Sequence, residues 1–288
     1  MYNWRSDEFF YYKYDTLSEK ERESYVSDIA RKSFAESVNH IDARKLLDDK
    51  WKTYETYKKY FNREACCVTK ANNDGRYEEL ISRKNALILK PLSGTLGKGI
   101  QVVTIEDGDS RTLLRSYPNG FIAEEIVKQD VRMAQLHPES VNTLRIHTLQ
   151  NNGVVEVFHP YIRMGRGKSV VDNAGSGGVF TSCNPETGEV LTAVDEWGNS
   201  YTNHPDTNFP LIGFLVPCWN EAFEFAKQLA LVNQNIHYCG WDLALTADGW
   251  VMIEGNARAQ MLFQISEHKG FKNELIERCQ RLGLECSI

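Results

Sequence analysis

The sequence predicts an α+β fold with antiparallel sheets, and three features support this class. The apolar side chains of the first sixty residues recur at helical spacing. Short β-rich runs begin after residue 65, and helical stretches interrupt them without a regular strand–helix–strand alternation. The expected strands are Ala86–Leu89, Ile100–Ile105, Phe121–Val127, Thr143–Leu149, Val154–Tyr161 and Leu243–Ile253. The expected later helices are Tyr77–Arg83, Asn220–Asn235 and Asn273–Leu282.

Composition excludes several classes of protein. The chain has 288 residues, 42% hydrophobic and 25% charged, which is ordinary for one large soluble domain or two that share a cleft. Its net charge is −6 with no long run of Lys or Arg, so a nucleic-acid surface is not expected. No window approaches the roughly 18 apolar residues of a membrane span, and no signal-peptide stretch is present. Seven cysteines, none in a CxxC pair, favour free thiols and a cytoplasmic location.

The N-terminal region predicts helices. Ser18–Glu21 resembles a capping box, and Tyr25 and Phe34 follow on the same helical pattern. A second helix is expected to begin at Asp42 and to continue through Tyr57. We interpret this region as a helical packing layer. Substrate contacts or an interaction surface are the alternatives.

A glycine-rich turn follows the strand that ends at Lys90. Gly94, Gly97 and Gly99 lie within six residues, and this spacing permits positive φ and a backbone that wraps phosphate oxygens. The ammonium of Lys90 would meet the same phosphates. A Walker loop would need a following helix and a Gly-Lys-Ser/Thr ending, and both are missing. A plain glycine-rich hairpin is the alternative interpretation.

The strongest signal is a second hairpin, whose turn is centred on Asp248. Positions whose numbers sum to 496 then lie opposite each other, which pairs Asp242 with Glu254. Strand alternation puts Asp242, Glu254 and Asn256 on one face. The other face is apolar and receives Trp241, Leu243, Leu245, Val251 and Ile253.

The polar face of this hairpin favours a cation site. Directly opposed carboxylates, roughly 5 Å apart at Cβ, repel and raise one another's pKa unless a cation lies between them. Oxygens of Asp242, Glu254 and Asn256 are hard ligands that suit Mg²⁺ bound to nucleotide phosphates. Arg258 would add a charge-assisted contact to phosphate. A solvent-facing hairpin with scattered charge is the alternative.

Four motifs, in this order, resemble the successive signatures of ATP-grasp enzymes. They are Lys90-Pro-Leu-Ser-Gly-Thr-Leu-Gly-Lys-Gly-Ile, Ala123-Glu-Glu-Ile, Trp241-Asp and Glu254-Gly-Asn-Ala-Arg. Two further segments more narrowly resemble the sugar-transfer-associated branch of that superfamily. These are Val141-Asn-Thr-Leu-Arg-Ile and Val171-Asp-Asn-Ala-Gly-Ser-Gly-Gly-Val. The similarity covers roughly residues 42–270.

The resemblance implies an ATP-grasp fold, with two α/β lobes whose antiparallel sheets enclose an ATP cleft. N-terminal helices precede the lobes here, and the usual N-terminal Rossmann-like domain is not recognisable. We therefore expect a helical region over residues 1–64 and a small nucleotide-binding lobe with the glycine-rich loop over 65–128. A large lobe with the metal-binding hairpin is expected over 129–288.

The same resemblance implies ATP and Mg²⁺ as cofactors, with two ions expected. The implied ATP-binding residues are Lys50, Lys90, Ser93, Gly94, Thr95, Gly97, Gly99, Glu124, Glu125, Ile126, Val127 and Asp130. Among them, Lys50 and Lys90 would approach the phosphates, Glu124–Val127 would be the adenine hinge, and Asp130 would lie near the ribose. The implied metal ligands are Asp242, Glu254 and Asn256. Arg145 and Arg258 are the expected catalytic residues, near the γ-phosphate or an acyl phosphate.

Candidate substrate residues rest on weaker patterns. They are Asn142, Asp172, Asn173, Ser176 and His204. A simple turn is the alternative for Asp172–Asn173 and for His204. For Arg145, which shares a strand face with Thr143 and His147, a surface salt bridge is the alternative.

The resemblance implies a carboxylate–amine (or thiol) ligase in surface-glycan or specialised-metabolite biosynthesis. ATP would activate the acid as an acyl phosphate, and the partners would be a small carboxylate and an amine or glycan-linked acceptor. An ATP-dependent phosphotransferase is the alternative enzyme, because the same groups would serve a hydroxyl acceptor. A nucleotide-binding module without turnover is a third class, against which the intact Asp242, Glu254, Asn256 and Lys90 argue. The sequence leaves the oligomeric state open.

Overall fold

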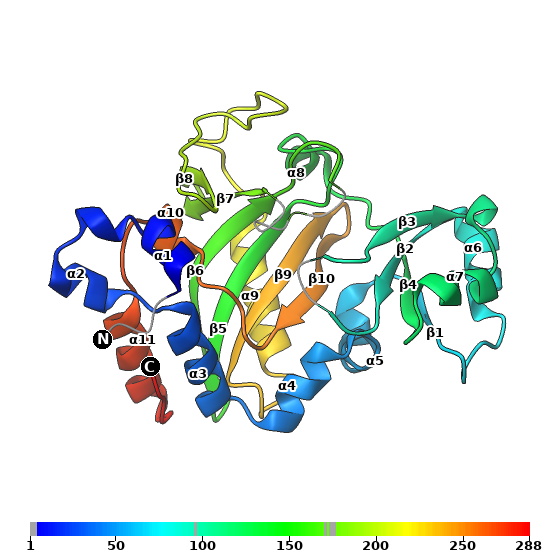
Figure 1. The fold of residues 1–288 in the computed structure, drawn as a ribbon, viewed down its shortest axis with the longest axis horizontal. Helices are drawn as coiled ribbons and strands as arrows, with labels where there is room; N and C mark the ends of the chain where they lie inside the picture. Colours follow the sequence, from blue (N-terminus) through cyan, green and yellow to red (C-terminus); the bar gives the residue numbers. More distant parts are fainter. Residues whose placement is uncertain (1–4, 95–96, 170–171, 173–176) are drawn as a thin grey trace. The chain divides into compact units, whose positions relative to one another are not determined.

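The computed structural model describes residues 5–94, 97–169, 172 and 177–288 (Figure 1). It contains two compact units. The large unit comprises the residues up to Arg44 together with Gln129–Ile288, and the small unit comprises Lys45–Lys128. The first division falls inside helix α4 (Ile41–Asp48), so the N-terminal helices contribute to both units.

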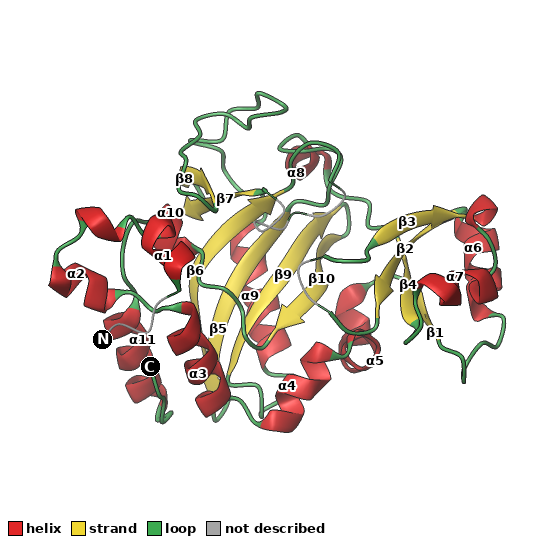
Figure 2. Cartoon of the chain, viewed as in Figure 1, coloured by secondary structure: helices red, strands yellow, loops and turns green. Residues whose placement is uncertain are grey.

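The large unit is built around a six-stranded antiparallel sheet (Figure 2). Its strand order is β10-β9-β5-β6-β7-β8, so the C-terminal hairpin forms one edge. The strands are β5 Thr143–Asn151, β6 Val154–Met164, β7 Val179–Cys183, β8 Val190–Asp195, β9 Tyr238–Thr246 and β10 Gly249–Asn256. Every pairing in this sheet is antiparallel, which confirms the predicted α+β class.

The two faces of this sheet have different neighbours. Helix α9 (Trp219–Ala230) runs behind the sheet in Figure 1 and packs on β5, β6, β9 and β10. Helices α3 (Asp28–Val38), α10 (Phe263–Ser266) and α11 (Lys272–Leu282) share a second apolar core with the sheet. This core contains Phe34, Val38, Leu149, Phe158, Tyr161, Tyr238, Phe263, Leu275 and Cys279. Helix α3 is therefore part of the core of the large unit.

The first helices of the chain are short and capped by their own sequence. They are α1 Ser6–Tyr11, the 3₁₀ turn Tyr14–Thr16 and α2 Glu19–Ser24. Ser18 Oγ accepts a hydrogen bond from the Glu21 N–H at 3.4 Å, and the Glu21 carboxylate accepts one from the Ser18 N–H at 2.7 Å. This reciprocal pair confirms the predicted capping box.

The helix expected from Asp42 onward is two helices, α4 and α5 (Lys50–Phe61). Asp49 separates them in an extended conformation, with φ −103° and ψ 107°. Its carboxylate accepts hydrogen bonds from the N–H groups of Trp51 and Lys52, both at 3.1 Å. An aspartate that caps a new helix ends the previous one, which is why the continuous pattern divides here.

The small unit has a four-stranded antiparallel sheet of order β1-β4-β2-β3. Its strands are β1 Ala65–Val68, β2 Ala86–Pro91, β3 Gln101–Thr104 and β4 Phe121–Glu125. Its further helices are α6 Arg76–Lys84, α7 Ser110–Ser116 and the 3₁₀ turn Ile105–Asp107. The sheet, α6 and α7 share a core of Cys66, Val68, Tyr77, Leu80, Ile81, Leu87, Leu89, Leu113 and Phe121. Strands β1, β7 and β8 are not among those expected from the sequence.

Two further observations concern the chain as a whole. Among the residues that the structure describes, no helix is long and apolar enough to cross a membrane. All seven cysteines are free thiols, as the absence of paired motifs predicts.

Candidate active site

The β9–β10 hairpin opposes Asp242 and Glu254, as the sequence predicts, but by a different register. Near the turn, Gly249 pairs with Thr246 and Met252 pairs with Leu243. The residue numbers of each pair therefore sum to one less than the predicted 496. A β-bulge between Met252 and Glu254 adds one residue to β10 and brings Glu254 opposite Asp242. The predicted symmetric register is therefore wrong beside the turn and correct at the carboxylates.

Asp242 is buried in a cluster of positive charge. Arg145 on β5 lies opposite it and donates from Nε to Oδ1 at 2.5 Å and from Nη2 to Oδ2 at 2.6 Å. Arg163 on β6 donates from Nη1 to Oδ2 at 2.8 Å. Burial by itself would raise the pKa of Asp242, but the charges of the two guanidinium groups outweigh it and lower the pKa to about 2. The sequence predicts a cation at this carboxylate, and here the arginines supply positive charge.

Arg163 is not among the site residues expected from the sequence. Its register partner on β5 is Thr143, and its guanidinium also lies 3.1 Å from the carboxylate of Asp172. The Thr143 hydroxyl donates to the same carboxylate. Burial raises the pKa of Asp172, and the nearby charge of Arg163 opposes that rise. An arginine at the end of an apolar strand could have indicated a buried charge. The strand expected from the sequence ends at Tyr161, so Arg163 falls outside it.

Asp242, Glu254 and Asn256 carry the kind of oxygen atom that a hard divalent cation takes as a ligand. Among the described residues no three His, Cys, Asp or Glu side chains could hold a metal together, so a site here would need the amide oxygen of Asn256. The Nδ2 atom of Asn256 lies 3.5 Å from Asp242 Oδ2. Asp242 Oδ1 accepts one hydrogen bond and keeps a lone pair for a ligand.

Arg258 follows β10 and is held by helix α3. Its Nε lies 3.4 Å from Glu36 Oε1, and its backbone carbonyl accepts a hydrogen bond from Arg31. Arg31 is itself paired with Asp28 at the start of the same helix. The N-terminal layer therefore determines the position of the segment that carries Arg258.

The glycine-rich turn of the small unit contacts the start of α5. The ammonium of Lys50 donates to the Gly94 carbonyl oxygen at 2.9 Å, and the Lys50 N–H donates to the Leu92 oxygen at 3.0 Å. Gly97 and Gly99 have φ of 68° and 76°, a region that favours glycine, as expected for a turn of this composition. Ser93 is exposed beside Gly94. Thr95 lies outside the described residues.

Lys90 lies in a buried charge cluster rather than on an open strand end. It is 8% exposed, and its Nζ lies 2.8 Å from Glu124 Oε1. Arg63 donates to the other oxygen, from Nε at 2.8 Å and from Nη2 at 2.5 Å. Burial would raise the pKa of Glu124, yet Arg63 and Lys90 lower it to about 2. Both charged partners stabilise the ionised carboxylate.

The other predicted hinge residues follow Glu124 along the chain. Strand β4 ends at Glu125, two residues earlier than expected, so Ile126 and Val127 lie beyond the strand. The Glu125 carboxylate lies 3.0 Å from the ammonium of Lys84. In the large unit, Asp130 caps the short helix α8 (Val131–Ala134).

The predicted substrate residues that the structure describes have structural partners. Asn142 is fully buried and its amide donates to Gln129 Oε1 and to the Met133 and His137 carbonyls. His204 Nε2 lies 3.0 Å from the Gly165 oxygen, and its Nδ1 accepts from the N–H groups of residues 206 and 207. Burial lowers the pKa of His204, which favours the neutral ring. Asn173 and Ser176 lie outside the described residues.

Comparison with known proteins identifies the family. A family model described as sugar-transfer associated ATP-grasp matches residues 112–280, more than half of the chain. Among solved structures, D-alanyl-alanine synthetase A from Vibrio cholerae is 13% identical, with a TM-score of 0.51 over 82% of this chain and 65% of the other. The ATP-grasp ligase PsnB, complexed with a minimal precursor, is 12% identical, with a TM-score of 0.52 over 85% and 64%.

The present chain spans less than two thirds of either structure. No curated protein matches it. At these identities the two structures establish the fold, and the family model establishes the family. The chain belongs to the sugar-transfer associated ATP-grasp family and has the ATP-grasp fold.

Proposed function

We propose that the protein is an ATP-dependent ligase that activates a carboxylate as an acyl phosphate and joins it to an amine or thiol. The observation that carries this proposal is the opposition of Asp242 and Glu254 on β9 and β10, within the segment matched by the family model. Two facing carboxylates with a neighbouring amide are suited to a divalent cation that accompanies nucleotide phosphates. The description of the family favours an acceptor linked to a glycan.

Asp242, Glu254 and Asn256 are the proposed ligands of Mg²⁺, with two ions expected. When bound, Mg²⁺ would neutralise charge on the transferred phosphoryl group. Arg145 and Arg163 already orient Asp242 and would keep its carboxylate ionised. Buried partners of this kind hold a ligand in one geometry before the substrate arrives.

The proposed nucleotide-binding residues belong to both units. In the small unit, the glycine-rich turn would offer backbone N–H groups to phosphate oxygens, with Lys50 at its first glycine. The backbone of Glu124–Val127 would bind adenine, and in the large unit Asp130 would lie near the ribose. Arg145 and Arg258 are the proposed catalytic cations, which would stabilise negative charge on the transferred group.

The chemistry requires two displacement steps. A carboxylate oxygen of the acid attacks the γ-phosphorus, the bond to the bridging oxygen breaks, and its electron pair leaves with ADP. The amine nitrogen then attacks the acyl carbon, the carbon–oxygen bond to phosphate breaks, and phosphate and a proton depart. The first step needs no general base, because a carboxylate is ionised at neutral pH.

A kinase would need a base for its hydroxyl acceptor. His147 and His204 are the candidate bases in the sequence, and neither is open to a substrate in the described structure. Both ring nitrogens of His204 have hydrogen-bond partners. His147 is fully buried, and its Nδ1 lies 3.0 Å from the Tyr238 hydroxyl. These contacts favour acyl-phosphate chemistry over phosphorylation of an alcohol.

The first experiment measures nucleotide binding. Mg-ATP should raise the melting temperature more than ATP with a chelator, because Mg²⁺ would link the nucleotide phosphates to Asp242 and Glu254 and so tighten binding to the folded protein. Glu254→Gln should lose the magnesium-dependent part of this shift. Glu277→Gln removes the same charge from an exposed position on α11 and should behave as wild type. A magnesium-dependent shift that survives Glu254→Gln would remove Glu254 from the proposed site.

The second experiment tests the reaction class. Candidate acids are incubated with the protein, ATP, Mg²⁺ and hydroxylamine, and the products are analysed by mass spectrometry. An acyl phosphate should be trapped as the hydroxamate, with release of one phosphate for each hydroxamate formed. A stable phosphoester without hydroxamate would identify a kinase instead.

A further inference from the structure

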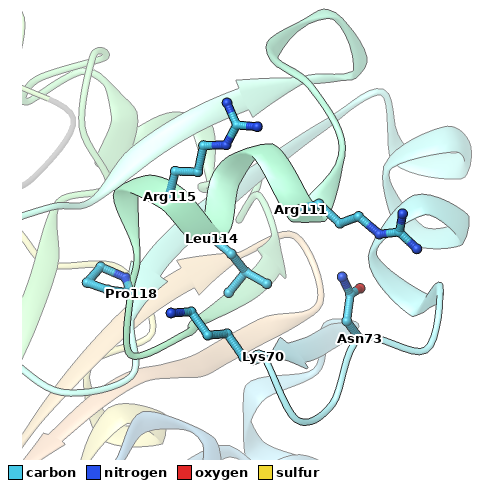
Figure 3. Close-up of a pocket in the computed structure, with 6 residues that line it drawn as sticks. All are labelled: Lys70, Asn73, Arg111, Leu114, Arg115 and Pro118. Atoms are coloured by element: carbon cyan, nitrogen blue, oxygen red, sulfur yellow. The ribbon is translucent and has the colours of Figure 1, made fainter.

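A basic pocket lies in the small unit, apart from the glycine-rich turn. Its volume is about 530 Å³, and it is lined by Lys70, Asn73, Arg111, Leu114, Arg115 and Pro118 (Figure 3). The lysine and asparagine come from the loop after β1, and the arginines and leucine come from α7. None of these residues is among the positions proposed for ATP.

The arrangement of the cations follows from the local structure. Arg111 and Arg115 are four residues apart on α7, and they extend from it in different directions in Figure 3. Lys70 extends beneath Leu114 toward Pro118. Positive charge therefore spans the width of the pocket, around an apolar patch formed by Leu114 and Pro118.

The described structure provides no ion-pair partner for Lys70, Arg111 or Arg115. The nearby carboxylates are used elsewhere: Asp74 binds Arg76 at 2.7 Å, and Asp109 accepts from the Thr112 N–H at 2.9 Å as the cap of α7. Together with this hydrogen bond, the charges of Arg111 and Arg115 help to lower the pKa of Asp109, so this carboxylate offsets part of their charge. Three cations against this one carboxylate still make an anion-attracting surface.

The polar groups at the far wall complete a set of donors. The Ser110 hydroxyl donates to Asn73 Oδ1 at 2.8 Å and also contacts Glu78. Because its oxygen is engaged, Asn73 presents its amide nitrogen as a donor. The Arg111 guanidinium and the Asn73 amide N–H, on the same side of the pocket in Figure 3, are donors suited to a phosphate group. Inorganic phosphate alone would leave much of the volume and the apolar patch unused.

We propose that this pocket binds an organic phosphate, through its phosphate group on Asn73 and Arg111 and its carbon skeleton on Leu114 and Pro118. Lys70 extends toward Pro118 and adds positive charge along the carbon skeleton. Arg115 adds charge at the other end of the pocket. This site is separate from the proposed nucleotide-binding residues and does not depend on them.

The test measures binding of glucose 1-phosphate, inorganic phosphate and sulfate to the full chain by calorimetry. Each titration is run without and with a saturating non-hydrolysable ATP analogue and Mg²⁺, which occupies the nucleotide site. Glucose 1-phosphate should bind more tightly than either inorganic anion. Each of Lys70→Gln, Arg111→Gln and Arg115→Gln should weaken it by about threefold or more, the effect expected for a partly screened charge. The triple variant should lose measurable binding.

Lys58→Gln is the matched control, because it removes an exposed charge from α5 in the same unit. It should leave binding unchanged. The substituted side chains are all exposed, so melting temperatures of the variants should match wild type. Unchanged affinity in the triple variant, or equal affinity for glucose 1-phosphate and sulfate, would overturn the proposal. Loss of all binding when the ATP analogue is added would also overturn it, because the probe would then occupy the nucleotide site.

Discussion

Asn39 and Tyr238 exchange two hydrogen bonds although they are 199 positions apart in the chain. Asn39 Nδ2 donates to the Tyr238 carbonyl at 2.8 Å, and the Tyr238 N–H donates to Asn39 Oδ1 at 2.9 Å. The same Nδ2 also donates to the Ala257 carbonyl at 3.1 Å. One side chain at the end of α3 thus satisfies backbone groups at the start of β9 and just after β10. It connects the N-terminal layer to the hairpin that carries Asp242 and Glu254.

Asn39→Ala should destabilise the large unit by about 2–4 kcal/mol, because it leaves three buried backbone groups without partners. Activity should fall as well, since the hairpin loses its connection to α3. Chemical denaturation gives the free energy of unfolding. Ser33→Ala changes an exposed position on the same helix and should stay within about 0.5 kcal/mol of wild type. Equal stability of the two variants would show that the Asn39 contacts contribute nothing.

Gly240→Ala should disturb the position of Arg145. A Cβ at Gly240 would lie 2.3 Å from the Ala259 Cβ and 3.1 Å from the Arg145 Cδ, so the backbone or the arginine must shift. We expect a loss of stability of about 1–3 kcal/mol from overpacking, together with reduced activity. Adding Ala259→Gly removes the shorter contact and should restore most of the stability. If the double variant is no more stable than the single one, the clash with Ala259 is not the cause.

Glu124 should make stability depend on acid pH. Its pKa is about 2 in the folded protein against an ordinary value of 4.5, so its contribution is present above pH 4.5 and is lost as pH falls toward 2. The shift corresponds to about 3 kcal/mol. The free energy of unfolding, measured between pH 2 and 6, should depend less steeply on pH in Glu124→Gln than in wild type. Glu125→Gln replaces the adjacent half-buried acid and should show the same pH dependence as wild type. An identical slope in wild type and Glu124→Gln would contradict the prediction.

Lys50 and Lys90 should respond differently to removal. Lys50→Ala loses an ammonium beside the glycine-rich turn, so ATP affinity should fall about tenfold with little change in stability. Lys90→Ala removes one of two cations from the buried Glu124 and should cost about 2 kcal/mol of stability. Nucleotide titration and denaturation on both variants separate the two roles. A Lys90→Ala variant with wild-type stability would contradict its structural role.

Features that depend on neighbours in the sequence could be predicted. The capping box at Ser18 and Glu21 and the pairing of Asp242 with Glu254 both arise within a few residues of a helix start or a turn. Local hydrogen bonds and strand alternation determine such features before any distant contact forms. The antiparallel α+β class followed from the same local patterns. The split at Asp49 was missed, although a capping aspartate was visible there.

Features that join distant segments could not be predicted. Arg163 reaches Asp242 from another strand, and Arg63 reaches Glu124 from 61 positions away. The bulge between Met252 and Glu254 changes the register of the hairpin. Each depends on which strands become neighbours in a sheet, and periodicity along one segment carries no information about that choice.

The sequence alone therefore determined the fold class, many of the helices and strands, the family resemblance and the two carboxylates that face each other on the C-terminal hairpin. Only the tertiary structure decided that two arginines hold one of those carboxylates, that Lys90 and Arg63 share a buried glutamate, and that the N-terminal helix supports the hairpin through Asn39. The physical reason is burial. Removal of these charged and polar groups from water requires partners, and only the folded chain brings those partners within hydrogen-bonding distance.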